Sequence, residues 1–106
     1  MPKISVTVPH TLDQPAALRS MQNLVTQTLA RSSDRLSGVQ HTWVGNLLEI
    51  SFKAMGFDIS GQLQVEPKEV HVTGQIPLAA YFFQSQIEGE IRQQLQRALT
   101  PAQTTV

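Results

Sequence analysis

The side chains of this 106-residue sequence best suited to acid–base or metal chemistry are its three histidines, His10, His41 and His71. A metal site needs such side chains to converge with carboxylates. None of the three has a second ligand two or four residues further along the chain. The sequence has no cysteine, which excludes thiolate ligands, thiol nucleophiles and disulfides. We therefore predict no metal site and no cofactor.

Glu49, Asp58 and His71 are the candidates for a general acid–base group. All three fall at positions of predicted strands that face solvent, where a carboxylate is ionised at neutral pH and makes a poor general acid. The sequence contains no G-x-S-x-G, no phosphate-binding glycine loop and no H-E-x-x-H. We therefore predict no catalytic residues and a protein that is not an enzyme.

Alternating apolar residues predict five strands that would carry these side chains. The predicted strands are residues 4–8, 39–44, 48–54, 57–66 and 70–76, with turns at Gly45–Asn46, Met55–Gly56 and Pro67–Lys68. One face of such a sheet is apolar and the other is mostly Ser, Thr and Gln, as in an antiparallel sheet with one solvated face. Gly61 and Gly74 fall on the apolar face, where a missing side chain either lets a helix approach closely or leaves room for a cavity.

Two amphipathic helices are expected to cover the apolar face. The first spans about residues 12–32, with Thr11 and Gln14 as a capping box and Pro15 in the first turn. The second spans residues 79–99, with an apolar stripe of Phe83, Ile87, Ile91, Leu95, Ala98 and Leu99.

The element order β-α-β-β-β-β-α predicts an α+β fold. We expect an antiparallel five-stranded sheet in the order 1-5-4-3-2 with both helices on one face, a reduced helix-grip-like arrangement. Residues 1–100 would form a single domain and residues 101–106 a flexible C-terminal tail.

The charge composition excludes several classes of partner. Eight basic and eight acidic residues cancel, which leaves no electrostatic surface for nucleic acid. No stretch approaches the roughly 20 apolar residues that span a bilayer, and the N-terminus lacks an apolar signal core. We expect a cytoplasmic protein. A charged fraction of only 15% repels neighbouring copies weakly, so a homodimer is one expected partner.

Tyr81, Phe82 and Phe83 are half of the six aromatic residues. Phe82 falls roughly 100° or more from the centre of the apolar stripe of the second helix. One interpretation is that residues 77–82 form a turn that folds Phe82 into the core. The other is that Phe82, together with Tyr81 or Leu78, forms an apolar contact for a partner chain, a ligand or a hydrophobic granule.

Three motifs resemble a bacterial family described as putative polyhydroxyalkanoic acid system proteins. They are an M-P-K-I opening that reaches Pro9–His10, S-G-x-L-x-V at residues 60–65, and I-E-x-E-I at residues 87–91. The resemblance covers about residues 1–99. It implies association with the synthesis or turnover of polyhydroxyalkanoate storage granules, and it supplies no catalytic residues.

The expected function is that of a non-enzymatic accessory protein that binds a polyhydroxyalkanoate granule or a granule protein. Two alternatives stay open. One is a module that binds a small apolar ligand in a pocket between the second helix and the sheet, lined by Phe52, Leu63, Val72, Phe83 and Ile87. The other is a dimerisation module that pairs through a sheet edge or through the Ser/Thr/Gln face.

Overall fold

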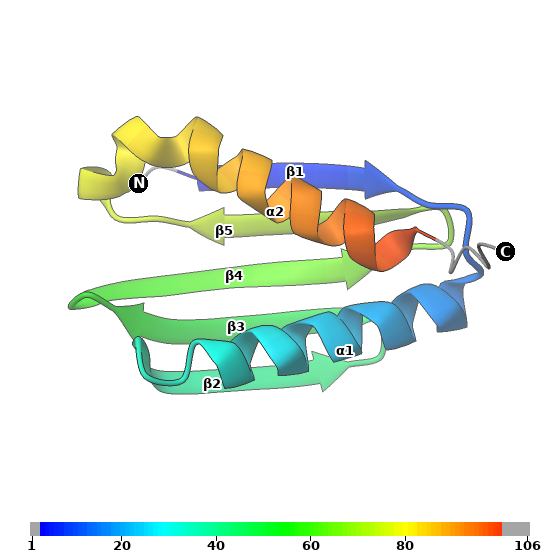
Figure 1. Ribbon diagram of the computed structural model, residues 1–106, viewed down its shortest axis with the longest axis horizontal. Helices are drawn as coiled ribbons and strands as arrows, with labels where there is room; N and C mark the ends of the chain where they lie inside the picture. Colours follow the sequence, from blue (N-terminus) through cyan, green and yellow to red (C-terminus); the bar gives the residue numbers. More distant parts are fainter. Residues whose placement is uncertain (1–2, 101–106) are drawn as a thin grey trace, which may run out of the picture.

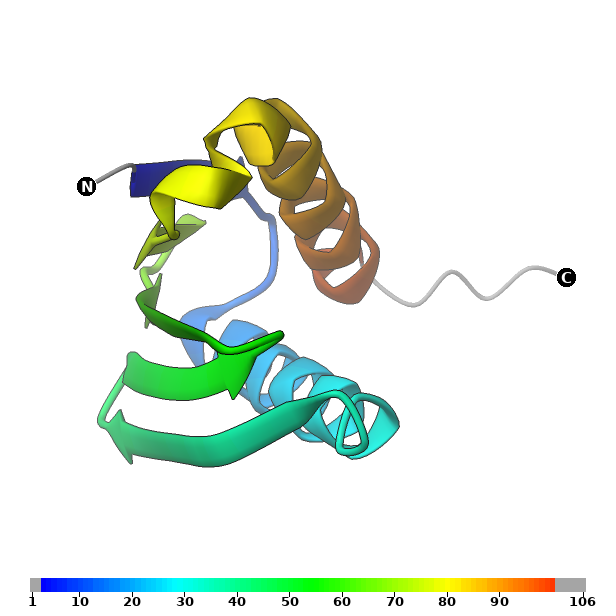
Figure 2. The same cartoon turned by 90° about the vertical axis from the view of Figure 1, so that its left-hand side faces the viewer.

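One antiparallel sheet with two helices on a single face makes up the computed structural model, which describes residues 3–100 (Figures 1 and 2). The strands are β1 (Lys3–Pro9), β2 (Leu36–Val44), β3 (Leu47–Ala54), β4 (Phe57–Val65) and β5 (Glu69–Gln75). The helices are α1 (Gln14–Arg31) and α2 (Gln84–Leu99), and a 3₁₀ helix, η1 (Leu78–Phe83), leads into α2. The strand order β1-β5-β4-β3-β2 and the α+β class confirm the predictions. The tail predicted at residues 101–106 lies outside the described residues.

Two tight turns set the register of the meander. At the β3–β4 turn both central residues, Met55 and Gly56, have positive φ angles of 53° and 83°, which is a type I′ turn. At the β2–β3 turn only Gly45, with a φ of 59°, is positive, which indicates type II′. Both types follow the right-handed twist of the strands, so they pair Val44 with Leu47 and Ala54 with Phe57. Alternate apolar residues of each strand then face the helices.

Strand β2 begins earlier than predicted, at Leu36 rather than Val39. A register shift between Ser37 and Gln40 lets the start of the strand rejoin β3, and Gly38 supplies the positive φ of 58° that this irregularity uses. Ser37 and Gly38 hid the extension, because they break the alternation of apolar and polar residues by which a strand is recognised in a sequence.

Helix α1 is capped by Asp13 and not by the predicted Thr11–Gln14 box. The Asp13 Oδ1 accepts a hydrogen bond from the Ala16 N–H at 2.8 Å, while the Gln14 side chain donates to the Val65 carbonyl at 3.0 Å. A cap at Thr11 would place Pro15 where the first intrahelical N–H is needed, and proline has none. With the cap at Asp13, Pro15 lies in the first turn, where that N–H is not used.

The core lies at the end of the molecule where the two helices converge. Figure 2 shows α1 and α2 spread apart toward the other end, where η1 lies. The buried helix residues are accordingly Ala17 and Met21 at the start of α1 and Leu95 and Leu99 at the end of α2. They pack against six buried sheet residues, Val6, Val8, Leu48, Leu63, Val65 and Val70.

Gly61 and Gly74 lie opposite each other on β4 and β5, in the middle of the sheet. A Cβ atom on Gly61 would lie 2.9 Å from the Thr73 carbonyl oxygen, and one on Gly74 would lie 3.3 Å from Cγ1 of Ile4. The nearest atoms thus belong to neighbouring strands. The sequence correctly placed both glycines on the apolar face, and the closest contact that the missing side chains allow is between neighbouring strands.

Gly61→Ala is expected to lower the free energy of unfolding by about 1–3 kcal/mol, because the added methyl group meets backbone that must shift. Gly89→Ala on α2 is the matched control. Nothing lies within 4 Å of a Cβ at Gly89, so this change should stabilise the protein by about 0.5–1 kcal/mol through helix propensity. Urea unfolding of both variants measures the change in the free energy of unfolding, which should be negative for Gly61→Ala and positive for Gly89→Ala. A Gly61→Ala protein as stable as the parent would contradict the close strand approach.

Candidate functional site

The most conspicuous surface feature is an apolar cluster on η1, which we call the η1 cluster: Leu78, Tyr81, Phe82 and Phe83. Their side chains are 76%, 54%, 88% and 56% exposed, respectively. The rings of Tyr81 and Phe82 meet edge to face, with centroids 6.2 Å apart. This short helix contains no charged residue. It therefore presents exposed, uncharged apolar side chains to its surroundings.

Of the two interpretations of Phe82, the one in which a turn buries it in the core is wrong. Residues 78–83 do leave the α-helical path, but as a 3₁₀ helix with about three residues per turn. The apolar stripe of α2, spaced for 3.6 residues per turn, does not continue into such a segment. For the same reason Phe83, which the sequence assigned to the core stripe, is exposed.

Both ends of η1 are fixed by the chain around it. Ile76, the residue after β5, is buried, and Pro77, with a φ of −64°, sets the direction in which the chain leaves the sheet. The Ala80 N–H donates to the Pro77 carbonyl at 2.9 Å. At the other end the Gln84 amide donates to the Lys3 carbonyl at 2.8 Å, which ties the start of α2 to β1. Hydrogen bonds thus anchor both ends of the segment that bears the η1 cluster.

The five residues predicted to line an apolar pocket are distributed between the core and the surface. Leu63 is buried beside its cross-strand partner Val72, Phe52 and Ile87 are half-buried, and Phe83 is exposed. Phe52 lines a hollow of about 650 Å³ near the β3–β4 turn. A pocket bounded by all five stays a prediction.

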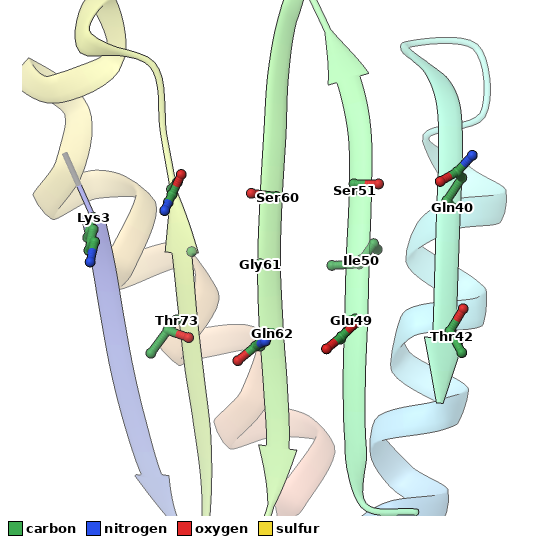
Figure 3. Close-up of a pocket in the computed structure, with 12 residues that line it drawn as sticks. Lys3, Gln40, Thr42, Glu49, Ile50, Ser51, Ser60, Gly61, Gln62 and Thr73 are labelled. Carbon is green, nitrogen blue, oxygen red and sulfur yellow. The ribbon is translucent and has the colours of Figure 1, made fainter. Parts of the chain in front are cut away.

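A larger hollow of about 700 Å³ lies on the opposite, polar face of the sheet (Figure 3). Figure 3 shows polar side chains standing on this face across the strands, among them Lys3, Thr42, Glu49, Gln62 and Thr73. They supply hydroxyl, amide and charged groups that can hydrogen-bond. The sequence predicted this polar face from its two-residue period. The curvature that makes this face a hollow depends on how the five strands bend together. The two-residue alternation of the sequence does not predict that bending.

The predicted acid–base candidates do not converge. Glu49 lines the polar hollow opposite Gln62, and Asp58 lies four residues before Gln62 on β4, 4.0 Å from the Lys53 amine. His71 contacts the Thr7 hydroxyl through Nδ1.

The other two histidines are structural or exposed. Nε2 of His10 lies 3.0 Å from the Glu66 carbonyl oxygen, which ties the loop after β1 to the β4–β5 turn. His41 is exposed on β2. Within residues 3–100 no group of three or more His, Asp or Glu side chains is placed to hold a metal ion.

No helix in the described part of the chain is long and apolar enough to cross a membrane. The chain is similar to a known protein family. A sequence model of the family described as "Putative polyhydroxyalkanoic acid system protein" covers residues 4–99. No curated protein matches the chain significantly.

Residues of two of the three motifs have structural roles in the fold. Gly61 of S-G-x-L-x-V provides the close strand approach, and its Leu63 and Val65 are buried in the core. Glu88 of I-E-x-E-I accepts a hydrogen bond from the Ser5 N–H of β1 at 2.9 Å. These motif residues build the sheet and fasten α2 to it.

Proposed function

Because this chain belongs to the family of putative polyhydroxyalkanoic acid system proteins, we propose that it is a non-enzymatic, cytoplasmic accessory protein that binds polyhydroxyalkanoate granules. The η1 cluster is the proposed contact. The observation that carries the proposal is the exposure of four large apolar side chains on one six-residue helix that bears no charge.

The free energy for such a contact comes from burial of apolar area. Covering a Phe side chain contributes roughly 1.5–3 kcal/mol, and Phe82 keeps 88% of its surface available for this. Leu78, Tyr81 and Phe83 add to the same patch. Part of this gain is offset by the loss of translational and rotational freedom on binding.

The chemistry of the polymer suits the same residues. A polyhydroxyalkanoate is a polyester, so its surface offers apolar chain and ester carbonyl groups that accept hydrogen bonds but donate none. The Tyr81 hydroxyl is a donor at the edge of an apolar patch, and an aromatic residue of this kind suits a surface that is apolar in bulk and polar at intervals. The absence of Lys and Arg from η1 distinguishes this contact from attraction to an anionic lipid surface.

We expect Phe82→Ser to lower the affinity for polymer particles by about ten- to a hundred-fold, which corresponds to the loss of one buried Phe. Co-sedimentation of the purified protein with protein-free polyhydroxyalkanoate particles measures the bound fraction. Met55→Ser is the matched control, because Met55 is 93% exposed on the β3–β4 turn and lies outside the η1 cluster.

The proposal fails in its direct form if the parent and Phe82→Ser proteins both remain in the supernatant. Repeating the measurement with native granules separates the polymer from its protein coat. If the parent protein binds only coated granules and Phe82→Ser does not bind them, the partner of the η1 cluster would be a granule protein and not the polymer.

A further inference from the structure

The sheet has two outer edges, β1 and β2, and side chains of α2 cover the first. Gln84 Nε2 donates to the Lys3 carbonyl at 2.8 Å, Glu88 Oε2 accepts from the Ser5 N–H at 2.9 Å, and Arg92 Nη1 donates to the Thr7 carbonyl at 3.3 Å. Four residues of a helix advance about 6 Å and two residues of a strand about 6.7 Å, so the two spacings match. Three side chains on one face of α2 thus bond the outer backbone of β1.

The β2 edge has no such cover. Six consecutive residues, 37–42, are exposed, and within residues 3–100 no helix side chain donates to or accepts from the β2 backbone. In the two-residue β2–β3 hairpin, Val44 and Leu47 form a hydrogen-bonded pair, and such pairs alternate along the ladder. The backbone groups of His41 and Trp43 therefore point away from β3 and are free to pair with another strand.

We propose that β2 pairs antiparallel with β2 of a second copy of this chain, about a two-fold axis, to form a continuous ten-stranded sheet. Open edges of monomeric proteins usually carry Lys, Pro or inward charges that prevent such pairing. Strand β2, LSGVQHTWV, has no Lys, Arg, Asp, Glu or Pro. Its one irregularity lies between Ser37 and Gln40, which leaves residues 40–44 as a regular, uncharged edge.

A second copy suits this edge better than an unrelated strand for two reasons. A two-fold axis places each β2 residue opposite the β2 residue of the other copy that lies equally far from the axis, and no Lys, Arg, Asp or Glu meets its like there. The covered β1 edge also means that each copy offers one free edge, so that pairing closes at two chains and does not propagate into a fibre.

The pairing has a consequence for both surfaces of the protein. Gln40 and Thr42 of β2 line the polar hollow, so the hollows of two copies would join across the new interface. The η1 clusters lie at the far edges, beside β1, and stay exposed (Figure 1). The inference does not depend on granule binding, because the β2 edge and the η1 cluster are separate surfaces.

The test uses the oligomeric state of the full chain by light scattering, where the parent protein is expected at twice the monomer mass. The double variants Gln40→Lys/Thr42→Lys and Gln40→Glu/Thr42→Glu place like charges across the two-fold axis, and each should raise the dimer dissociation constant at least tenfold. Their equimolar mixture should recover the dimer, since opposite charges then face each other. Both sites are exposed, and circular dichroism checks that the fold is kept.

Gln62→Lys/Gln64→Lys is the control, with the same added charge on the same face but on the central strand β4, and it should remain dimeric. A monomeric parent protein at high concentration overturns the proposal. So does a lysine or glutamate pair on β2 that leaves the dimer intact.

Discussion

Met21→Ala is expected to be among the most destabilising substitutions in this chain, with a loss of about 2–5 kcal/mol in the free energy of unfolding. Met21 is completely buried and is one of the largest side chains in the core, where it packs among residues of both helices and the sheet. Truncation to Ala removes apolar contact and leaves a cavity that close-packed neighbours fill only in part. A domain of this size has roughly 5–15 kcal/mol of stability, so one side chain accounts for a large share of it.

Met55→Ala gives the matched comparison, because the same chemical change is made at a side chain that is 93% exposed. It should shift the free energy of unfolding by no more than about 0.5 kcal/mol. Urea unfolding followed by circular dichroism measures both variants. Similar midpoints for the two would show that the helices do not close over Met21 as described.

The sheet was the part of the fold most accessible from the sequence. Alternation of apolar and polar residues in β3, β4 and β5, broken by Gly45–Asn46 and Met55–Gly56, predicted the strands, and their directions then predicted that β1 pairs with β5. These are local signals with one dominant cause, the burial of one face of an antiparallel sheet.

The helix starts were harder to predict from the sequence, because several residues near each start could begin the helix. Thr11 and Asp13 are both capping residues, and the choice between them depends on where Pro15 can be tolerated. At the second helix, 3₁₀ and α geometry compete over residues 78–83. The chain takes 3₁₀ geometry after the buried Ile76 and Pro77, and no periodic pattern in the sequence predicts this choice. The exposure of the η1 cluster follows from this geometry.

The hydrogen bonds between polar residues of α2 and β1 could not be predicted from the sequence. Glu88 and Arg92 are typical of a solvated helix face. Their hydrogen bonds to β1 form because α2 lies along that strand in the fold. The bonded residues are more than eighty positions apart in the sequence. Helix α2 therefore takes part in two surfaces. It follows directly on η1, which bears the η1 cluster, and its polar side chains bond the outer backbone of β1.

If the hydrogen bonds from α2 to β1 are removed, we expect the proposed β2–β2 dimer to grow into longer assemblies. In a Glu88→Ala/Arg92→Ala protein, the Ser5 N–H and the Thr7 carbonyl lose their α2 partners, and β1 becomes a second free edge. Ile91, Leu95 and Leu99 still hold α2 on the sheet, so the loss in folding free energy should stay near 1–3 kcal/mol. We expect a weight-average mass that exceeds the dimer and rises with protein concentration, measured by light scattering.

Two further variants separate edge opening from general destabilisation. Gln93→Ala/Gln96→Ala changes two exposed residues of α2 that make no bond to β1, and this protein should keep the mass of the parent. Adding Gln40→Lys/Thr42→Lys to the edge-opened protein blocks β2, so that only β1 edges can pair and growth should stop again at two chains. Growth that continues in this combined variant would indicate aggregation of unfolded chains, and the covered β1 edge would then not be what limits assembly.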